Sequence, residues 1–317
     1  MIQQHIAKSR LSIPVMTLYG IAVWTVLLLS DLSLWPAAIL FTISLLLLTE
    51  LNNRNALNRQ HNRKVCCIYI ATMAMCPDIL ANIHAMAVQT CLMAALMQLF
   101  QTYQRRDDMT HRYAAYLFFG IGITLWPPLL FFLPIFWFGE AVFLMSFSLR
   151  AWGASLLGLL TPLWFALPLL IYFSRFDLLF QKVNEILPDE TTIHTLSTAF
   201  QNIQAPAMPP IRLAATALII IMFVVSTVYY LRHSYNDKIQ VRMLHHFLIV
   251  LATAASIALI ATILLPLNTT AATACLTGII IATAAPSATQ YITLTTSRAA
   301  GVIIVIFFVL SILLAWI

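Results

Sequence analysis

A chain of 317 residues in which 61% are apolar and only 9% are charged is not a water-soluble globular domain. Such domains carry about 25% charged residues, and they could not hide this much apolar surface. The net charge of +6 would suit nucleic acid, but the Lys and Arg residues lie in short segments between apolar runs, where they set orientation in a membrane. We therefore expect an all-α polytopic membrane protein. Its expected partner is the lipid bilayer, and no nucleic-acid partner is expected.

Eleven apolar runs predict membrane-spanning helices in a single transmembrane domain covering residues 1–317, since a span needs about 20 apolar residues. The first run lacks a small-x-small cleavage site before Asp31, so we interpret it as a retained span. Two short runs adjoin prolines, so each is a half-span or part of a kinked helix, and nine or ten spans are also possible. The predicted spans are 14–30, 33–50, 65–77, 83–101, 113–126, 128–147, 151–173, 211–231, 245–266, 270–286 and 299–316.

The orientation follows from the distribution of positive charge. With eleven spans and a cytoplasmic N-terminus, all but three of the 17 Lys and Arg residues fall on the cytoplasmic side. The three exceptions are Arg175, Lys182 and Arg212. This asymmetry is what the positive-inside rule predicts for a multi-pass membrane protein with a cytoplasmic N-terminus.

The segment 174–210, between spans one to seven and spans eight to eleven, is the longest polar excursion of the chain. Apolar residues recur in it at helical spacing, with Phe176 and Phe180 on one predicted helix and Phe200 on a second. Each helix is short enough to need an apolar surface for support. We expect two amphipathic helices on the outer side, either as a connector lying on the membrane or as a lid over a cavity.

The stretch from Ala252 to Thr289 is rich in Ala, Thr and Ser. Such small residues let membrane helices approach closely, so spans nine and ten are predicted to pack inside the bundle. A polar path along these helices is the alternative interpretation. The sequence contains no convincing internal repeat of the kind that many secondary transporters have.

Two acidic residues are predicted at the outer surface. Asp31 ends the first span, and Asp78 follows Pro77 at a helix break. A carboxylate at either position could act as a general base or bind a metal beside a lipid-borne substrate. The simpler interpretation is an interfacial residue that ends a helix and faces water.

Glu140 is predicted to lie within the sixth span. An unpaired ionised acid there costs at least about 2 to 3 kcal/mol, so we expect it to be protonated, paired or facing a wet cavity. His84, at the start of the fourth span, is a conceivable partner. If the span boundary shifts by a few residues, Glu140 instead reaches a surface.

A basic inner loop contains Lys238 and Arg242 and is followed by His245 and His246. These residues could hold lipid head-group phosphates, although such clusters more often only fix orientation. Adjacent histidines point in different directions on a helix, so no metal site is predicted. No cofactor is indicated by the sequence.

The overall plan resembles a family of uncharacterised bacterial polytopic inner-membrane proteins of about this length. The resemblance lies in three segments, 51–55, 119–162 and 237–242, which include Trp126-Pro127-Pro128 and Arg150-Ala151-Trp152. This family brings no assigned activity, so the resemblance implies fold and topology alone.

A second resemblance is to integral-membrane glycosyltransferases that use polyprenyl-phosphate sugars. Asp31 matches the acidic residue of their first outer loop, and Arg105-Arg106 matches their basic loop. Those enzymes have a long first outer loop with two interfacial helices, whereas here the amphipathic helices follow the seventh span. The resemblance implies a catalytic role for Asp31.

Three functions therefore remain open from the sequence. The first is binding of an amphiphilic or lipid-linked ligand, or of a membrane partner, at the outer face. The second is transfer of a sugar from a lipid carrier, with Asp31 and Asp78 in catalysis. The third is proton-coupled transport through Glu140.

Overall fold

The computed structural model describes residues 12–58, 64–172, 209–264, 270–295 and 298–315. These residues form α-helices and short 3-10 helices, with no strand among them. The elements are α2 (Ser12–Ser30), η1 (Leu32–Leu34), α3 (Trp35–Asn55), α4 (Lys64–Ala74), α5 (Pro77–Ala81), α6 (Ile83–Phe100), α7 (Met109–Leu125), η2 (Pro127–Phe132), α8 (Leu133–Val142), α9 (Leu149–Tyr172), α12 (Pro210–His233), η3 (Ser234–Asn236), α13 (Ile239–Leu264), α14 (Thr270–Leu294) and α15 (Arg298–Ala315).

Seven of the described helices are long and apolar enough to cross a membrane. Their composition explains this, because apolar runs without charges satisfy every backbone group internally only as helices. The two short predicted spans, 65–77 and 113–126, correspond to α4, which has 11 residues, and to α7, which has 17. The all-helical membrane class predicted from the sequence is therefore confirmed.

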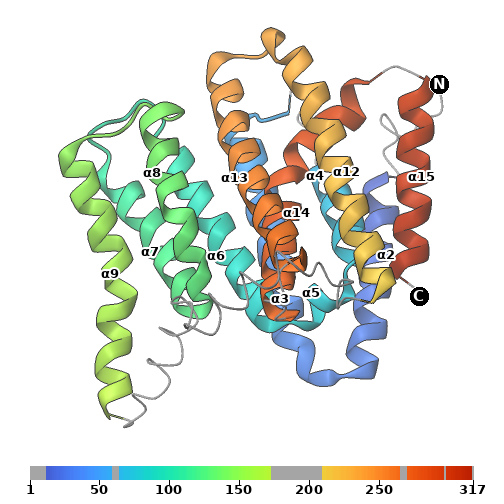
Figure 1. Cartoon of the computed structure of the whole chain (residues 1–317), viewed down its shortest axis with the longest axis horizontal. Helices are drawn as coiled ribbons and strands as arrows, with labels where there is room; N and C mark the ends of the chain where they lie inside the picture. Colours follow the sequence, from blue (N-terminus) through green and yellow to red (C-terminus); the bar gives the residue numbers. More distant parts are fainter. Residues whose placement is uncertain (1–11, 59–63, 173–208, 265–269, 296–297, 316–317) are drawn as a thin grey trace.

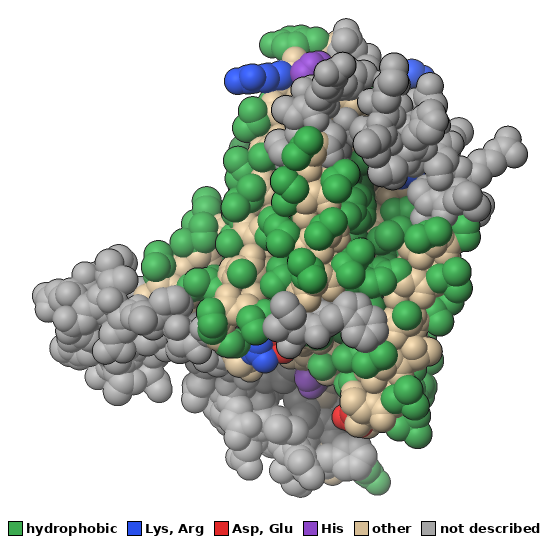
Figure 2. Space-filling view, turned by 90° about the vertical axis from the view of Figure 1, so that its right-hand side faces the viewer, with side chains coloured by type: hydrophobic (Ala, Val, Ile, Leu, Met, Phe, Trp, Pro, Cys, Tyr) green, Lys and Arg blue, Asp and Glu red, His purple; other side chains and the backbone are tan. Residues whose placement is uncertain are grey.

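The helices lie side by side with their long axes close to parallel (Figure 1). The connections α6–α7, α8–α9 and α12–α13 lie at the upper end of Figure 1, whereas η1 and α5 lie at the lower end. We call these two ends of the helix bundle the upper end and the lower end. Figure 2 shows hydrophobic side chains across the middle of one face, with Lys and Arg at the top and a few charged and His side chains near the bottom.

Helix α14 is the centre of the bundle. Every residue from Thr273 to Ile292 is buried, and the helix packs against α4, α6, α12 and α13. Its threonine hydroxyls bond to carbonyls one turn back, as Thr277 does to Thr273 O at 2.7 Å, so they are satisfied without water. For this helix the predicted interior position is confirmed.

Two close helix contacts depend on glycine. A Cβ on Gly158 of α9 would lie 2.6 Å from the carbonyl oxygen of Tyr113 in α7. On Gly278 of α14 it would lie 3.2 Å from Oε1 of Gln89, a fully buried residue of α6. Small residues therefore allow these helices to approach as closely as they do.

Candidate functional site

Two adjoining cavities open at the lower end, where α5, α6, α12 and α14 meet. The smaller has a volume of about 220 Å³ and the larger about 480 Å³. Asp78, Arg212 and Thr270 line both of them. We call the two cavities together the Asp78 hollow.

An ion pair forms the shared wall of the Asp78 hollow. Nε of Arg212 contacts Oδ2 of Asp78, and each side chain is 39% exposed. Burial raises the pKa of the Asp78 carboxyl, and the Arg212 guanidinium partly opposes this rise. Both charged groups are thus partly open, and each keeps room for a second partner.

Proline placement explains why these two residues meet. Pro77 begins the five-residue helix α5, which puts Asp78 in its first turn. Asn82 ends α5 and caps α6 by accepting a bond from the backbone N–H of Ala85 at 3.1 Å. Pro210 likewise begins α12 and puts Arg212 in its first turn, because proline lacks only an N–H that is already unpaired there.

The walls of the hollow are mainly apolar with a few polar groups. The smaller cavity is lined by aliphatic residues such as Ile79 and Ile211 together with Thr273 and Thr277, and the larger one adds His84. This mixture is typical of sites that bind small molecules or head groups.

The first turns of three helices also contribute to this site. The larger cavity is lined by Ile83 at the start of α6, by Arg212 in the first turn of α12 and by Thr270 at the start of α14. Helix N-termini carry unpaired N–H groups and a partial positive charge. Together with Arg212 they favour a hydrogen-bond-accepting or anionic group, while Asp78 would accept a cationic one.

A metal centre has no ligand set within the described part of the chain. No group of three or more His, Cys, Asp or Glu residues there is arranged to hold a metal ion. Asp78 and His84 are the only such residues among those that line the larger cavity.

Asp31 lies outside the linings of both cavities. It is exposed and caps η1, accepting a bond from the N–H of Ser33 at 2.9 Å. This hydrogen bond lowers the pKa of the Asp31 carboxyl. The structure therefore gives this residue a capping role, and it does not bring Asp31 and Asp78 into one cavity.

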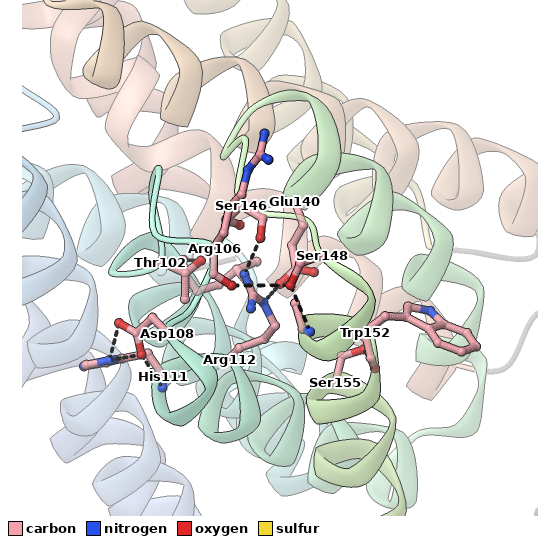
Figure 3. A network of polar contacts seen from close by, with 12 residues as sticks. Thr102, Arg106, Asp108, His111, Arg112, Glu140, Ser146, Ser148, Trp152 and Ser155 are labelled. Carbon is pink, nitrogen blue, oxygen red and sulfur yellow. Dashed lines mark hydrogen bonds and ion pairs between the residues drawn. The ribbon is translucent and has the colours of Figure 1, made fainter.

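Glu140 is fully buried in α8 and forms an ion pair with Arg112 of α7 (Figure 3). Nε of Arg112 donates to Oε1 of Glu140 at 3.1 Å, and Nη2 donates to the carbonyl oxygen of Ser146 at 2.8 Å. Glu140 is therefore paired, which was one of the expected alternatives. Its partner is Arg112, a residue that the sequence indicated only as a cytoplasmic positive charge. His84 instead lines the Asp78 hollow.

The residues of the predicted head-group site separate in the structure. Lys238 is exposed, whereas His245 is fully buried and stacks on Tyr230 with ring centroids 4.5 Å apart. Nδ1 of His245 lies 3.1 Å from the carbonyl oxygen of Val241. Of the four predicted residues, His245 is the one closed off from the surface, since Lys238 is exposed and Arg242 and His246 are half-buried.

Three predicted binding residues, Phe176, Phe180 and Phe200, lie outside the described residues, as do the two predicted amphipathic helices. Sequence reasoning did not single out Arg212 as a site residue. The available signal was that Arg212 is one of three basic residues predicted on the outer side, and that it follows the Pro209-Pro210 pair.

Comparisons of the chain with protein-family models, with curated proteins and with solved structures find no match. Function is therefore argued from the geometry of the site. Both family resemblances remain predictions.

Proposed function

We propose that this protein is a bacterial inner-membrane protein that binds an amphiphilic or lipid-linked ligand at its outer face, with the polar head in the Asp78 hollow. The observation that carries the proposal is the Asp78–Arg212 pair, half exposed on the shared wall of two largely apolar cavities. A ligand with a polar or anionic head and an apolar body matches these walls.

The proposed orientation places the lower end outside the cell. Arg54, Arg150 and Arg232 are among the basic residues in helix turns at the upper end. Among the described Lys and Arg residues, Arg212 is the one in a first turn at the lower end. An eleven-span topology with a cytoplasmic N-terminus accounts for this distribution through the positive-inside rule.

Lipid retention tests the proposal. The protein is purified in a mild detergent, and bound lipids are identified by native mass spectrometry for the wild type, Arg212→Gln and Arg150→Gln. We expect Arg212→Gln to lose a specific lipid that Arg150→Gln retains, because Arg150 is an exposed arginine at the opposite end. Equal lipid retention by all three proteins would refute binding at the hollow.

A membrane glycosyltransferase-like activity is the second candidate. The observation in its favour is that the hollow holds a carboxylate, Asp78, whose pKa burial raises toward the range of a general base or acid. Asp78→Asn is the decisive variant, and Asp31→Asn serves as its comparison. Full complementation of a deletion strain by both variants would exclude catalysis by these carboxylates.

Proton-coupled transport through Glu140 is the third candidate. Glu140 lies on the wall of neither cavity and is paired with Arg112. Transport would require this pair to open. Wild-type behaviour of Glu140→Gln at every pH tested would exclude that role.

A further inference from the structure

The Asp78–Arg212 ion pair offers a ligand one charge of each sign. Nε of Arg212 contacts Oδ2 of Asp78, so this contact does not involve the two Nη groups of the guanidinium or Oδ1 of the carboxylate. A guanidinium has five N–H donors and a carboxylate has two accepting oxygens, so one mutual contact saturates neither group. Because both side chains are also 39% exposed, the pair can bind an anionic group through Arg212 and a cationic group through Asp78 at the same time.

The lining of the larger cavity favours a head group that has more acceptors than donors. Among the described residues that line it, Arg212, Asn82 and His84 carry N–H groups, and Asp78 is the one carboxylate. Oδ1 of Asn82 already accepts the N–H of Ala85 at 3.1 Å, so the amide NH2 is the part of this side chain that remains to donate. Several donors around one acidic acceptor match a phosphate beside a single ammonium group.

A head group of one sign fits the ion pair less well. A purely anionic head at Arg212 would lie beside the Asp78 carboxylate, because the two side chains are in contact. A purely cationic head at Asp78 would likewise lie beside the guanidinium. Like charges brought together in a partly buried site repel strongly, and such repulsion is a common source of specificity. A zwitterionic head avoids both repulsions, because each of its charges lies next to the opposite charge of the pair.

The smaller cavity extends from the ion pair into the bundle. Its lining follows α14 from Thr270 to Thr277, which is about 10 Å of helix at a rise of about 1.5 Å per residue. Met75, Ile79 and Ala274 also line it, and all three are buried. An apolar chain attached to the head group would therefore lie between walls that exclude water. A lipid fits the two cavities better than a water-soluble zwitterion, which has no apolar part for these walls.

We propose that the Asp78 hollow selects a zwitterionic lipid whose head carries a phosphate and a primary ammonium group, as in a phosphoethanolamine head. The phosphate binds Arg212, the ammonium donates to Asp78, and an acyl chain occupies the smaller cavity. A short two-carbon spacer between the two charges of the head suits two side chains that are in direct contact. This inference rests on the proposed function, since it names the class of lipid that the same site binds.

Lipid competition tests the proposal. The purified protein is equilibrated in mild detergent with equal amounts of phosphatidylethanolamine, phosphatidylglycerol and phosphatidylcholine with identical acyl chains, and bound lipid is measured by native mass spectrometry. These heads are respectively a zwitterion with a donating ammonium, an anion, and a zwitterion whose quaternary ammonium cannot donate. We expect phosphatidylethanolamine to be bound severalfold more than either competitor. A preference for phosphatidylglycerol, or equal binding of the two zwitterions, would overturn the proposal.

Asp78→Asn tests the role of the carboxylate. This variant should still bind lipid through Arg212 but should lose the preference for phosphatidylethanolamine over phosphatidylglycerol. Asp31→Asn is the matched control, because Asp31 is an exposed aspartate that caps η1 and lies outside the linings of both cavities. It should keep the wild-type preference. An unchanged preference in Asp78→Asn would contradict the assignment of the ammonium to this residue.

This inference and the proposed function fail in different ways. If the wild type binds all three lipids equally and Arg212→Gln loses them, the hollow binds lipid without selecting a zwitterion, and only the class of lipid is wrong. If Arg212→Gln retains lipid as well as the wild type does, both fail. The melting temperature in detergent shows whether each variant is folded, and the wild-type preference is measured without any variant.

Discussion

Replacing Arg112 by Met should be among the most damaging single changes in the bundle. The substitution keeps an apolar stem of similar length but removes the bonds of 3.1 Å to Glu140 and 2.8 Å to the Ser146 carbonyl. It leaves a fully buried carboxylate without a counter-charge. Breaking a buried ion pair in this way costs about 3–5 kcal/mol, because the remaining charge stays buried without its counter-charge.

A second substitution, Glu140→Met, should restore much of the stability that Arg112→Met removes. Arg112→Met/Glu140→Met removes both charges, and an apolar replacement of a buried pair is often close to neutral in stability. We therefore expect the double variant to be less destabilised than the sum of the two single variants. Arg150→Met, at an exposed arginine in the first turn of α9, should change stability by less than about 0.5 kcal/mol.

Reversible unfolding by SDS in mixed micelles, followed by tryptophan fluorescence, gives the free energy of unfolding for each variant. A double-mutant cycle then isolates the coupling between the two residues. Additive losses would refute the reasoning, since they would mean that each charge is stabilised by something other than its partner.

Three further outcomes are expected from the same unfolding assay. Gly158→Ala should lower the free energy of unfolding by about 1–3 kcal/mol, because its Cβ would lie 2.6 Å from the carbonyl oxygen of Tyr113. Gly153→Ala is the control: its Cβ would meet nothing within 4 Å, so this variant should be neutral or slightly stabilised. Tyr69→Phe should cost about 1–3 kcal/mol by leaving buried partners unpaired, and an unchanged stability would show that the hydroxyl is not needed. Asp108→Ala should cost about 1 kcal/mol by removing the cap of α7. Burial acts to raise the pKa of Asp108, but hydrogen bonds from His111 lower this pKa overall. The stability that the Asp108 cap contributes is therefore present above the unfolded-state pKa of about 3.9. It should disappear as the pH falls through the lower folded-state pKa.

The candidate site shows the limit of reasoning along the chain. Asp78 was predicted as an outer carboxylate beside a helix break, because Pro77 is visible in the sequence. Its partner Arg212 belongs to a helix that begins after the long polar segment, and no spacing rule connects the two. Only the packing of α5 beside α12 decides that they form one ion pair.

Glu140 illustrates the same limit from the interior. Hydropathy predicted that an acid in this apolar run must be protonated, paired or facing a wet cavity, since an unpaired charge is too unfavourable in a membrane. The identity of the partner depended on how α7 and α8 face each other, and the sequence had placed Arg112 in a cytoplasmic loop. The structure puts it in the first turn of α7 with its side chain fully buried.

The sequence by itself determined the helical membrane class and the predicted ranges of most helices. It also determined the burial of α14, because hydropathy and small-residue content are sums over neighbouring residues and need no knowledge of the partner helices. Tertiary structure alone decided that Asp78 meets Arg212 beside a hollow, that Asp31 caps a helix turn outside that hollow and that Glu140 is paired with Arg112. Those pairings arise from contacts between helices, and contacts between segments distant in the chain leave no periodic signal in a single sequence.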